Sequence, residues 1–412
     1  MPVLLYLLAV AVFAQGTSEF VLAGILPGIA TDLDVSLGRA GLLTSAFAVG
    51  MVIGAPAMAA AARRLSPRWT LTGFLALFVA AHVVGAVTDS FVVLLATRIA
   101  AALANAGFLA VALATVTRIV PPERRTRALA VILGGTTLAL VAGVPAGAFI
   151  GDLLGWRATL WAIALLCLPA LAAVLAAMPT RATGADGAEV TASIGGELAS
   201  LRSRPVQLTL VLAVLVNAAT FCTFTYLAVI ATGPAALPER AVPVLLAVFG
   251  LGAFLGVSAA GRFGDRHWQR LIPVSAPLLM AGWVLLALSI TIPAALWLLA
   301  LTQGALSFAL GSTLIARVLA TARDAPTMGG SFATVALNIG AAVGPVGGGA
   351  AIELIGVRGP VIVSAVLVLL AVAVWSLASV RHGAAVRRDQ DESRTSVVGA
   401  ERSRRWPRGA RS

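Results

Sequence analysis

Long uninterrupted runs of apolar residues constrain this chain more than any other feature. Each run is about 20 residues long, and a helix of that length crosses the roughly 30 Å hydrocarbon core of a bilayer. Of the 412 residues, 59% are hydrophobic and only 11% are charged, whereas a soluble domain carries about 25% charged residues. The sequence therefore excludes a soluble globular enzyme and predicts a protein that spans a membrane many times.

Twelve such runs divide the chain, and none alternates in polarity as the strands of a membrane β-barrel do. We predict an all-α polytopic membrane protein with twelve transmembrane helices, in two six-helix halves (1–178 and 206–380). A polar linker (179–205) joins them, and a basic tail (381–412) is expected to be disordered. The predicted spans are residues 4–25, 41–62, 70–88, 91–117, 128–151, 158–178, 206–231, 241–261, 271–291, 293–317, 329–352 and 360–379.

The basic residues set the orientation. All 29 are arginines, and with both termini inside only Arg39, Arg157, Arg240 and Arg358 fall in outer loops. This asymmetry predicts cytoplasmic N- and C-termini, and it explains the net charge of +12 without a nucleic-acid partner. The first run lacks a basic start and a cleavage site, so we expect a retained span rather than a signal peptide.

The two halves share motifs about 200 residues apart. Asp152-Leu-Leu-Gly-Trp-Arg157 follows the fifth span, and Glu353-Leu-Ile-Gly-Val-Arg358 follows the eleventh. Just upstream, Gly-Val-Pro-Ala-Gly at 143–147 matches Gly-Pro-Val-Gly at 344–347. Repeated six-span halves with a site at the membrane midplane are typical of secondary transporters.

Several segments carry a resemblance to a known family. They are GTSEFVLAGILPGIATDLDVSLGRAGLLTSAFAVGMVIGAP in spans 1 and 2, RIAAALANAGFLAVAL in span 4, GVPAG and GDLLGWR around span 5, and GSTLIARVL with APTMGGSFATVALNIGAAVGP in spans 10 and 11. The chain resembles the major facilitator superfamily, and within it the drug:proton antiporters and chloramphenicol-efflux proteins of actinomycetes.

The resemblance implies proton-coupled efflux of a small neutral amphiphilic drug such as chloramphenicol, by alternating access, from a bacterial plasma membrane. We expect a monomer without cofactor or metal. No nucleotide motif is present, and the glycines between Gly250 and Gly256 lie inside a span, where they predict close helix packing instead. Cys167 and Cys222 lie in apolar runs and predict neither a disulfide framework nor a zinc site.

Two family motifs carry over incompletely. The loop after span 2 departs from the family's pattern, with Ala59 in place of its glycine and Arg63 in place of its aspartate. Its counterpart after span 8 keeps Gly261, Asp265 and Arg266. In the antiporter motif of span 5, Val144 separates the usual Gly-Pro pair and leaves Gly143, Pro145 and Gly147.

Glu19 and Arg98 are charged residues inside predicted spans. Such a residue costs at least about 2.5–3.5 kcal/mol on insertion scales, so it indicates a function and a partner. Both lie about seven residues from an outer span end, roughly 10 Å deep, so they could pair. We expect Glu19 to exchange a proton under the influence of Arg98; the alternative is a static ion pair that joins two helices.

Neutral polar and aromatic residues form the expected drug site. Asn217, Phe221 and Phe224 share one helical face in span 7 by their spacing, and a flat aromatic drug would suit that face; lipid-facing or packing roles are the alternative. Packing hydrogen bonds are likewise the alternative for the amides elsewhere. The complete predicted set is Asn105, Asn217, Phe221, Phe224, Gln303 and Asn338.

The remaining polar residues of the spans and loops have structural interpretations. His82 in span 3 is read as a packing residue, Asp32 and Asp34 as caps of span 2, and Asp152–Arg157 and Glu353–Arg358 as interfacial ion pairs. An exporter of sugars or other metabolites is the main alternative function, although a sugar site would need more polar cavity residues. A membrane enzyme lacks a nucleophile–base cluster here, and a sensor lacks a signalling domain.

Overall fold

The computed structural model describes residues 2–61, 66–177, 199–322 and 329–379, and its regular structure within those ranges is helical throughout. Most of the predicted linker (179–205) and all of the tail (381–412) fall outside the described residues. Eleven helices are long and apolar enough to span a membrane, and the bent pair formed by the first two helices makes a twelfth span. The all-α, twelve-span prediction is confirmed.

The N-terminal half contains eight α-helices and one π-helical turn. Prolines at the first position begin several of them, because proline needs no N–H bond there. The elements are α1 (Pro2–Phe20), α2 (Leu22–Asp32), α3 (Leu37–Ala61), α4 (Pro67–Val87), α5 (Phe91–Ile119), α6 (Pro122–Leu138), η1 (Ala139–Gly143), α7 (Val144–Leu154) and α8 (Trp156–Ala177).

The C-terminal half follows after the short 3-10 turn η2 (Ser200–Arg202). Its elements are α10 (Arg204–Phe224), α11 (Leu227–Thr232), the turn η3 (Glu239–Ala241), α12 (Val242–Leu288), α13 (Pro293–Thr321), α14 (Gly329–Ile355) and a last span over Gly359–Ser379.

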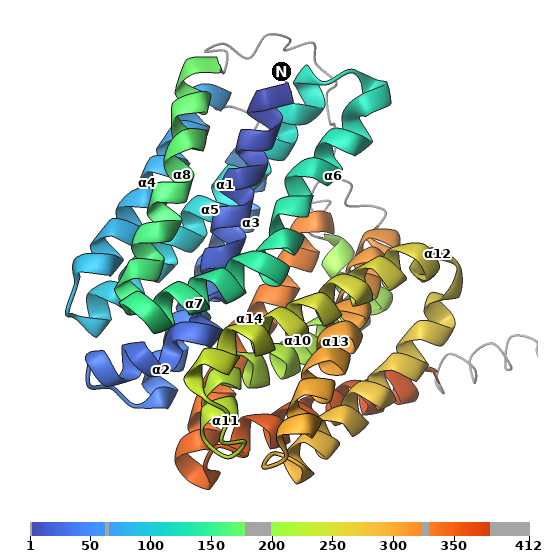
Figure 1. Cartoon of the computed structure of the whole chain (residues 1–412). Helices are drawn as coiled ribbons and strands as arrows, with labels where there is room; N and C mark the ends of the chain where they lie inside the picture. Colours follow the sequence, from blue (N-terminus) through green and yellow to red (C-terminus); the bar gives the residue numbers. More distant parts are fainter. Residues whose placement is uncertain (1, 62–65, 178–198, 323–328, 380–412) are drawn as a thin grey trace, which may run out of the picture.

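Two predicted boundaries differ from the structure. The first span continues past residue 25 to Asp32, with a bend of 53° where α1 gives way to α2. The predicted break between spans 8 and 9 is absent, because α12 continues through it as one helix whose two parts each suffice to span. The polar stretch from Asp265 to Arg270 contains no glycine or proline that would end a helix. The helical backbone of α12 therefore continues through it while the helix changes direction (Figure 1).

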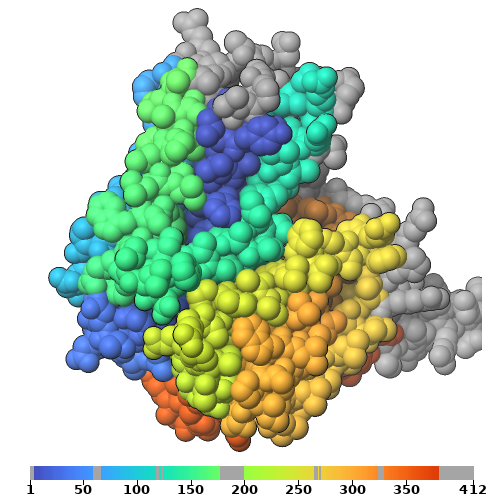
Figure 2. Space-filling view, viewed as in Figure 1, coloured from blue at the N-terminus to red at the C-terminus, as the bar shows by residue number. Residues whose placement is uncertain are grey.

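Each half has its own apolar core. One cluster of buried side chains runs from Leu4 to Val174. A second occupies residues 212–371 and includes four alanines and valines from the first half: Ala23, Ala48, Val144 and Ala148. Twelve spans put the two ends of the described chain on one side, here called the termini side, and the bend of α1 and α2 lies towards the far side. The halves diverge between α6 and α12, where the surface is hollowed (Figure 2).

The internal repeat is visible in the backbone. Gly155 after α7 has φ of 84° and Gly356 after α14 has φ of 78°, a conformation in which glycine ends helices without strain. Asp34 and Ala236, after the first span of each half, have φ of 48° and 50°. Both of those first spans are also broken near the far side, one between α1 and α2 and the other between α10 and α11.

Candidate functional site

Glu19 lies on α1 just before the bend at Val21, and its side chain is partly exposed. Since the span extends to Asp32, Glu19 lies deeper than its spacing from residue 25 indicated. The next residue, Phe20, reaches the other half, where its ring lies 5.8 Å from that of Phe221 on α10.

The span 5 motif holds this part of α1. A Cβ atom on Gly143 would collide with the hydroxyl of Thr17, and one on Gly147 would collide with Val21. Pro145 has no N–H to donate to the helical partner four residues earlier, and the preceding turn, η1, widens into a π-helix. Single π-turns are frequent at functional sites. The motif therefore lets α7 and η1 approach α1 on both sides of Glu19.

Arg98 on α5 is 2% exposed and lies beside Ser18. Its Nη1 donates to Ser18 Oγ at 2.9 Å, and its Nη2 donates to the Ser18 carbonyl at 2.6 Å. Its guanidinium also lies over the ring of Phe47, 4.7 Å from the centroid. Among the described residues it forms no ion pair with Glu19. The two charges are thus neighbours, but the predicted contact between them is absent in this conformation.

His82 on α4 extends this contact into a chain of hydrogen bonds. Its Nδ1 lies 2.8 Å from the carbonyl of Phe78, and its Nε2 lies 2.7 Å from Ser18 Oγ. The sequence predicts a packing role for His82 and gives no sign of Ser18. The only signal available was that three polar residues lie in apolar spans, since no pattern within one helix shows that they meet.

Aromatic rings connect the two halves. From Phe20 the series continues through Phe221 to Phe224 at 6.1 Å, to Phe249 on α12 at 4.7 Å, and to Phe308 on α13 at 6.3 Å. The structure thus brings the predicted Phe221 and Phe224 together, with Phe221 against Phe20, the residue that follows Glu19. The other three rings, Phe20, Phe249 and Phe308, could not be predicted, because single phenylalanines in apolar spans carry no distinguishing pattern.

The four predicted amides each tie helices or turns together. Asn105 donates to Met51 Sδ at 3.6 Å, and Asn217 donates to the Leu337 carbonyl at 2.6 Å. Gln303 donates to the Leu279 carbonyl at 2.9 Å, and Asn338 donates to Thr334 within α14 at 3.0 Å. Gln303 also lines a small cavity of about 10 Å³ beside Phe224 and Phe249. Only Asn217 among them is partly exposed.

The halves meet closely between the far side and the middle of the spans. Gly41 on α3 packs against the hydroxyl of Tyr226, as does Gly349 on α14. The Tyr226 hydroxyl donates to the Pro345 carbonyl at 2.8 Å, and Ser45 Oγ donates to the Ala342 carbonyl at 2.7 Å. Because glycine lacks a side chain, α3 and α14 can approach closely.

A second contact between the halves joins η1 and α12. A Cβ atom on Gly250 would collide with the carbonyl of Leu140, and one on Gly24 would collide with Leu246. The remaining glycines of that predicted packing motif, Gly252 and Gly256, pack α12 against α13, as expected. In the loop motif after span 8, Gly261 is exposed, and the side chains of Asp265 and Arg266 lie outside the described residues.

The predicted acidic roles on the far side were wrong. Arg157 pairs with Asp32 and with Asp89, rather than with Asp152. Glu353 accepts a hydrogen bond from Ser36 Oγ at 2.8 Å, and no ion pair with Arg358 is found among the described residues. Ser36 also caps α3, in place of the predicted aspartates. Neighbours in sequence were poor guides, because these side chains reach across to other helices.

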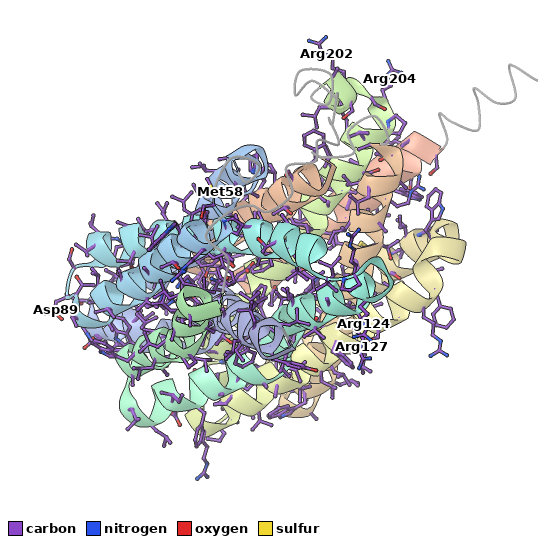
Figure 3. The ribbon with its side chains drawn as sticks, turned by 90° about the horizontal axis from the view of Figure 1, so that it is seen from above. Met58, Asp89, Arg124, Arg127, Arg202 and Arg204 are labelled. Carbon is purple, nitrogen blue, oxygen red and sulfur yellow. The ribbon has the colours of Figure 1, made fainter. Side chains whose placement is uncertain are left out.

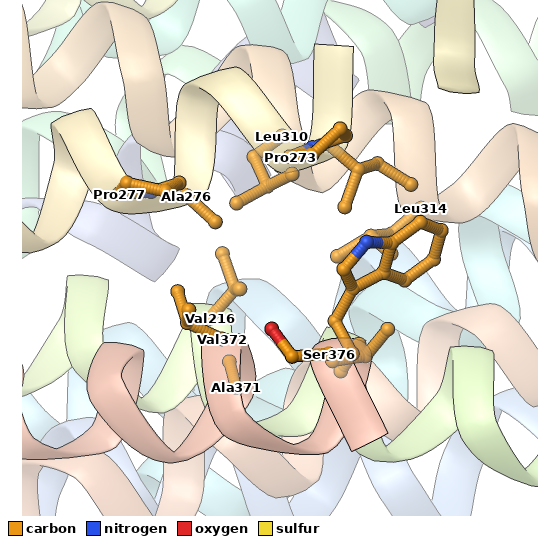
Figure 4. A pocket seen from close by; sticks show the side chains of 12 residues that line it. Val216, Pro273, Ala276, Pro277, Leu310, Leu314, Ala371, Val372 and Ser376 are labelled. Carbon is orange, nitrogen blue, oxygen red and sulfur yellow. The ribbon is translucent and has the colours of Figure 1, made fainter. Parts of the chain in front are cut away.

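Pockets outside this region contain none of the predicted site residues. One of about 90 Å³ lies within the C-terminal half, where Val216, Pro273 and Trp375 line an apolar crevice (Figure 4). Another of about 710 Å³ opens on the far side between α2, α7 and η3. Within the described ranges no three His, Cys, Asp or Glu residues are grouped as metal ligands.

Comparison with known proteins gives consistent matches. The model of the Major Facilitator Superfamily matches residues 8–335 and 239–408. A "Chloramphenicol resistance protein" of Streptomyces lividans is 55% identical over 350 residues, which cover 84% of this chain and 88% of that protein. The "Inner membrane transport protein YdhP" of Escherichia coli (strain K12) is 30% identical over 354 residues, with the same coverage of 84% and 88%.

Solved structures agree on the fold. A bacterial homologue of the human lysosomal transporter Spinster, in an inward-facing and unoccupied conformation, matches with a TM-score of 0.73 at 19% identity, covering 92% of this chain and 96% of that one. A mutant of the nucleoside transporter NupG matches with a TM-score of 0.72 at 14% identity, covering 91% and 98%.

Proposed function

Because the chain belongs to the Major Facilitator Superfamily, we propose that this membrane transporter exports a small neutral amphiphilic drug in exchange for protons. Chloramphenicol is the first candidate substrate, since the Streptomyces lividans relative is named for resistance to it. Export would lower the drug concentration inside the cell and make the cell resistant. The protein resides in the bacterial plasma membrane.

One observation in the structure supports coupled export above all: Glu19 immediately precedes Phe20, whose ring contacts Phe221 of the other half. A group that can take up a proton therefore adjoins the aromatic contact between the halves. A flat amphiphilic drug that stacks on these rings would change the contact between the two halves close to this carboxyl group. Proton uptake and drug binding would then influence each other directly.

The coupling residues in this proposal are Glu19 and Arg98. Protonation of Glu19 from outside would favour drug release, and its deprotonation inside would permit drug binding. If one proton exchanges for one neutral drug molecule, one charge moves in each cycle. The membrane potential would then contribute about 2.3 kcal/mol per 100 mV in addition to the pH gradient.

Alternating access would come from rocking of the two halves, 1–178 and 206–380. The arginine distribution favours cytoplasmic termini, so the termini side would be the inner side. The close contacts at Gly41, Gly349 and Ser36 lie towards the far side, which supports an inward-open conformation. Gly143, Pro145 and Gly147 would support α1 during this motion, and Gly261, Asp265 and Arg266 would act at the inner loop.

Drug binding in this proposal uses Phe221, Phe224 and the partly exposed Asn217. The amides of Asn105, Gln303 and Asn338 would shape the surrounding helices. We further propose that the protein acts as a monomer and performs no enzymatic reaction. An exporter of sugars or other small metabolites remains the second candidate, but a sugar needs several free hydrogen-bonding groups, and the amide nitrogens here already donate within the protein.

Drug accumulation in a sensitive bacterial host tests this proposal. Cells that express the protein should accumulate several-fold less labelled chloramphenicol than cells with the empty vector, and a protonophore should abolish the difference. Equal accumulation, with the protein detected in the membrane, would reject chloramphenicol as substrate. Reduced accumulation that a protonophore leaves unchanged would reject proton coupling.

A further inference from the structure

Arg98 is a buried cation whose two hydrogen bonds go to a serine. It is 2% exposed, its Nε has no hydrogen-bond partner among the described residues, and no carboxylate lies within ion-pair distance. A buried charge is costly unless other groups compensate for it. Ser18 and the ring of Phe47 supply this compensation. Glu19, which follows Ser18 in the sequence, forms no ion pair with Arg98 among the described residues.

The hydrogen-bond chain has one consistent direction. The Phe78 carbonyl can only accept, so Nδ1 of His82 carries the proton. In a neutral imidazole Nε2 then accepts, so the Ser18 hydroxyl donates to His82. The lone pairs of Ser18 Oγ are thereby left for the guanidinium of Arg98. His82 thus orients the hydroxyl that holds Arg98, and the titratable groups that face this cluster are Glu19 and His82.

We propose that Ser18 and His82 form a second holding site for Arg98, which competes with Glu19 for the guanidinium. When Glu19 is protonated, Arg98 rests on Ser18, as in this structure. When Glu19 loses its proton, Arg98 moves to the carboxylate. Because Ser18 and Glu19 are adjacent in sequence, this transfer needs only a side-chain movement. Ser18 and His82 are positioning residues: they hold Arg98, and they neither bind the drug nor carry the exchanged proton. This inference rests on the proposed function.

The test separates proton-driven export from drug exchange, which involves no net proton movement. In proteoliposomes, Ser18→Ala should lower export driven by a pH gradient about tenfold, the scale of one lost hydrogen bond to a charged group. Exchange of labelled for unlabelled chloramphenicol should stay within twofold of the unmodified protein. His82→Ala should act in the same direction but less strongly. Equal losses in both assays would show a merely structural role and overturn the proposal.

A double variant sharpens the test. Because His82 acts only through Ser18, the variant that combines S18A and H82A should export as poorly as S18A alone. If the double variant instead lost export by the product of the two single losses, the proposal would be overturned. The control is Thr115→Val, which removes a buried hydroxyl on the same helix as Arg98 that bonds only to its own helix, at Val111. If Glu19→Gln also keeps gradient-driven export, the proposed function itself fails; if only S18A and H82A behave normally, this inference alone fails.

A different observation carries a second inference, at the termini side of the N-terminal half. There a pocket of about 500 Å³ has an apolar wall from α1 and α6, including Leu5 and Val131, with Arg124 and Arg127 among its lining residues. The two arginines lie three residues apart on α6 and so share a face. Both are exposed and neither has an ion-pair partner among the described residues. Figure 3 shows them next to each other.

The position of this pocket matches the headgroup level of a bilayer. The apolar window of α5 ends at Val116, and that of the next span begins at Arg127. Two cations therefore stand above an apolar wall at the edge of the hydrocarbon core, an arrangement that complements an anionic headgroup with an acyl chain. We infer that an anionic phospholipid binds here, with its phosphate on the two arginines and its chain along Leu5 and Val131, which are both partly exposed.

Thermal stability of the purified protein in nanodiscs tests the lipid site. Phosphatidylglycerol should raise the melting temperature above that in phosphatidylcholine, and replacing Arg124 and Arg127 by glutamine should remove most of this rise. The matched control replaces Arg202 and Arg204, two exposed arginines at the start of the other half. Figure 3 shows them well away from Arg124 and Arg127, and this variant should keep the rise. Equal loss in both pairs would show a general charge effect. An equal rise with inorganic phosphate in phosphatidylcholine would show a free-anion site instead.

Discussion

The two halves of the molecule share a backbone plan but differ in chemistry. Gly155 and Gly356 have similar positive φ angles, and Asp34 and Ala236 form a second matching pair with smaller positive φ angles. The first span of each half is broken near the far side. The core of the first half nevertheless buries Arg98 and His82, whereas near its own break the second half offers Phe224 and the hydroxyls of Thr220 and Thr223.

This difference teaches that the repeat preserves helix ends and close approaches rather than side-chain functions. Turns and bends depend on the backbone, so both copies keep a positive φ at matching places, and glycine adopts it without strain at Gly155 and Gly356. A buried charge is costly in a membrane. Because coupling needs a single proton-exchanging group, only one half carries that cost. We therefore expect proton handling to depend on the first half and drug affinity to depend on the second.

The strongest test of this division removes the acid of the first half. Glu19→Gln should lower pH-gradient-driven export at least a hundredfold, because the amide cannot exchange a proton, while the protein still folds in the membrane. Proteoliposome transport of labelled chloramphenicol measures this loss. Glu239→Gln, which changes an exposed acid on η3, is the control and should transport normally. Normal export by E19Q would end the proton-coupling assignment.

The contact between the halves is the next point to break. A methyl group on Gly41 would collide with the hydroxyl of Tyr226, so Gly41→Ala should hinder closure of the far side and lower transport about tenfold. Gly134→Ala adds the same methyl group where no atom lies within 4 Å, and should have no effect. The accessibility of single cysteines placed on α3 reports the closure directly; equal closure in both variants would contradict the prediction.

Drug affinity should respond to the rings of the second half. Phe221→Ala removes the contact with Phe20, and an aromatic pair contributes about 0.5–1.5 kcal/mol beyond its buried area. We expect the KM for chloramphenicol to rise about fivefold with little change in the maximal rate. Phe254→Ala removes a ring that is 45% exposed on α12 and should leave KM unchanged. A fall in rate without a change in KM would move Phe221 out of the binding site.

Gln303 should have the smallest effect. Its amide bonds to the Leu279 carbonyl at 2.9 Å within the C-terminal half, so Gln303→Leu should change KM less than twofold. The thermal stability of the Gln303→Leu variant should fall slightly, since one buried hydrogen bond contributes about 1 kcal/mol. A large rise in KM would instead show that Gln303 turns towards the drug in another conformation.

Much of the fold could be read from the sequence. The bilayer requires about 20 apolar residues per span, so composition along the chain revealed every span, including the one that bends between α1 and α2. The paired motifs around Gly155 and Gly356 revealed the repeat, since both copies need the same residue at the same turn. Helix ends were less certain: nothing in the hydropathy showed that α2 continues to Asp32 or that α12 crosses Asp265.

What the sequence by itself determined was which residues lie within spans and which of them share a helix face, because apolar length and the helical repeat fix both. That is enough to identify Glu19 and Arg98 as charges inside the membrane. Only the tertiary structure decided that Arg98 bonds to Ser18 and not to Glu19, that His82 orients this serine, and that Phe20 meets Phe221. These contacts depend on how neighbouring helices rotate and approach, which packing between distant segments decides.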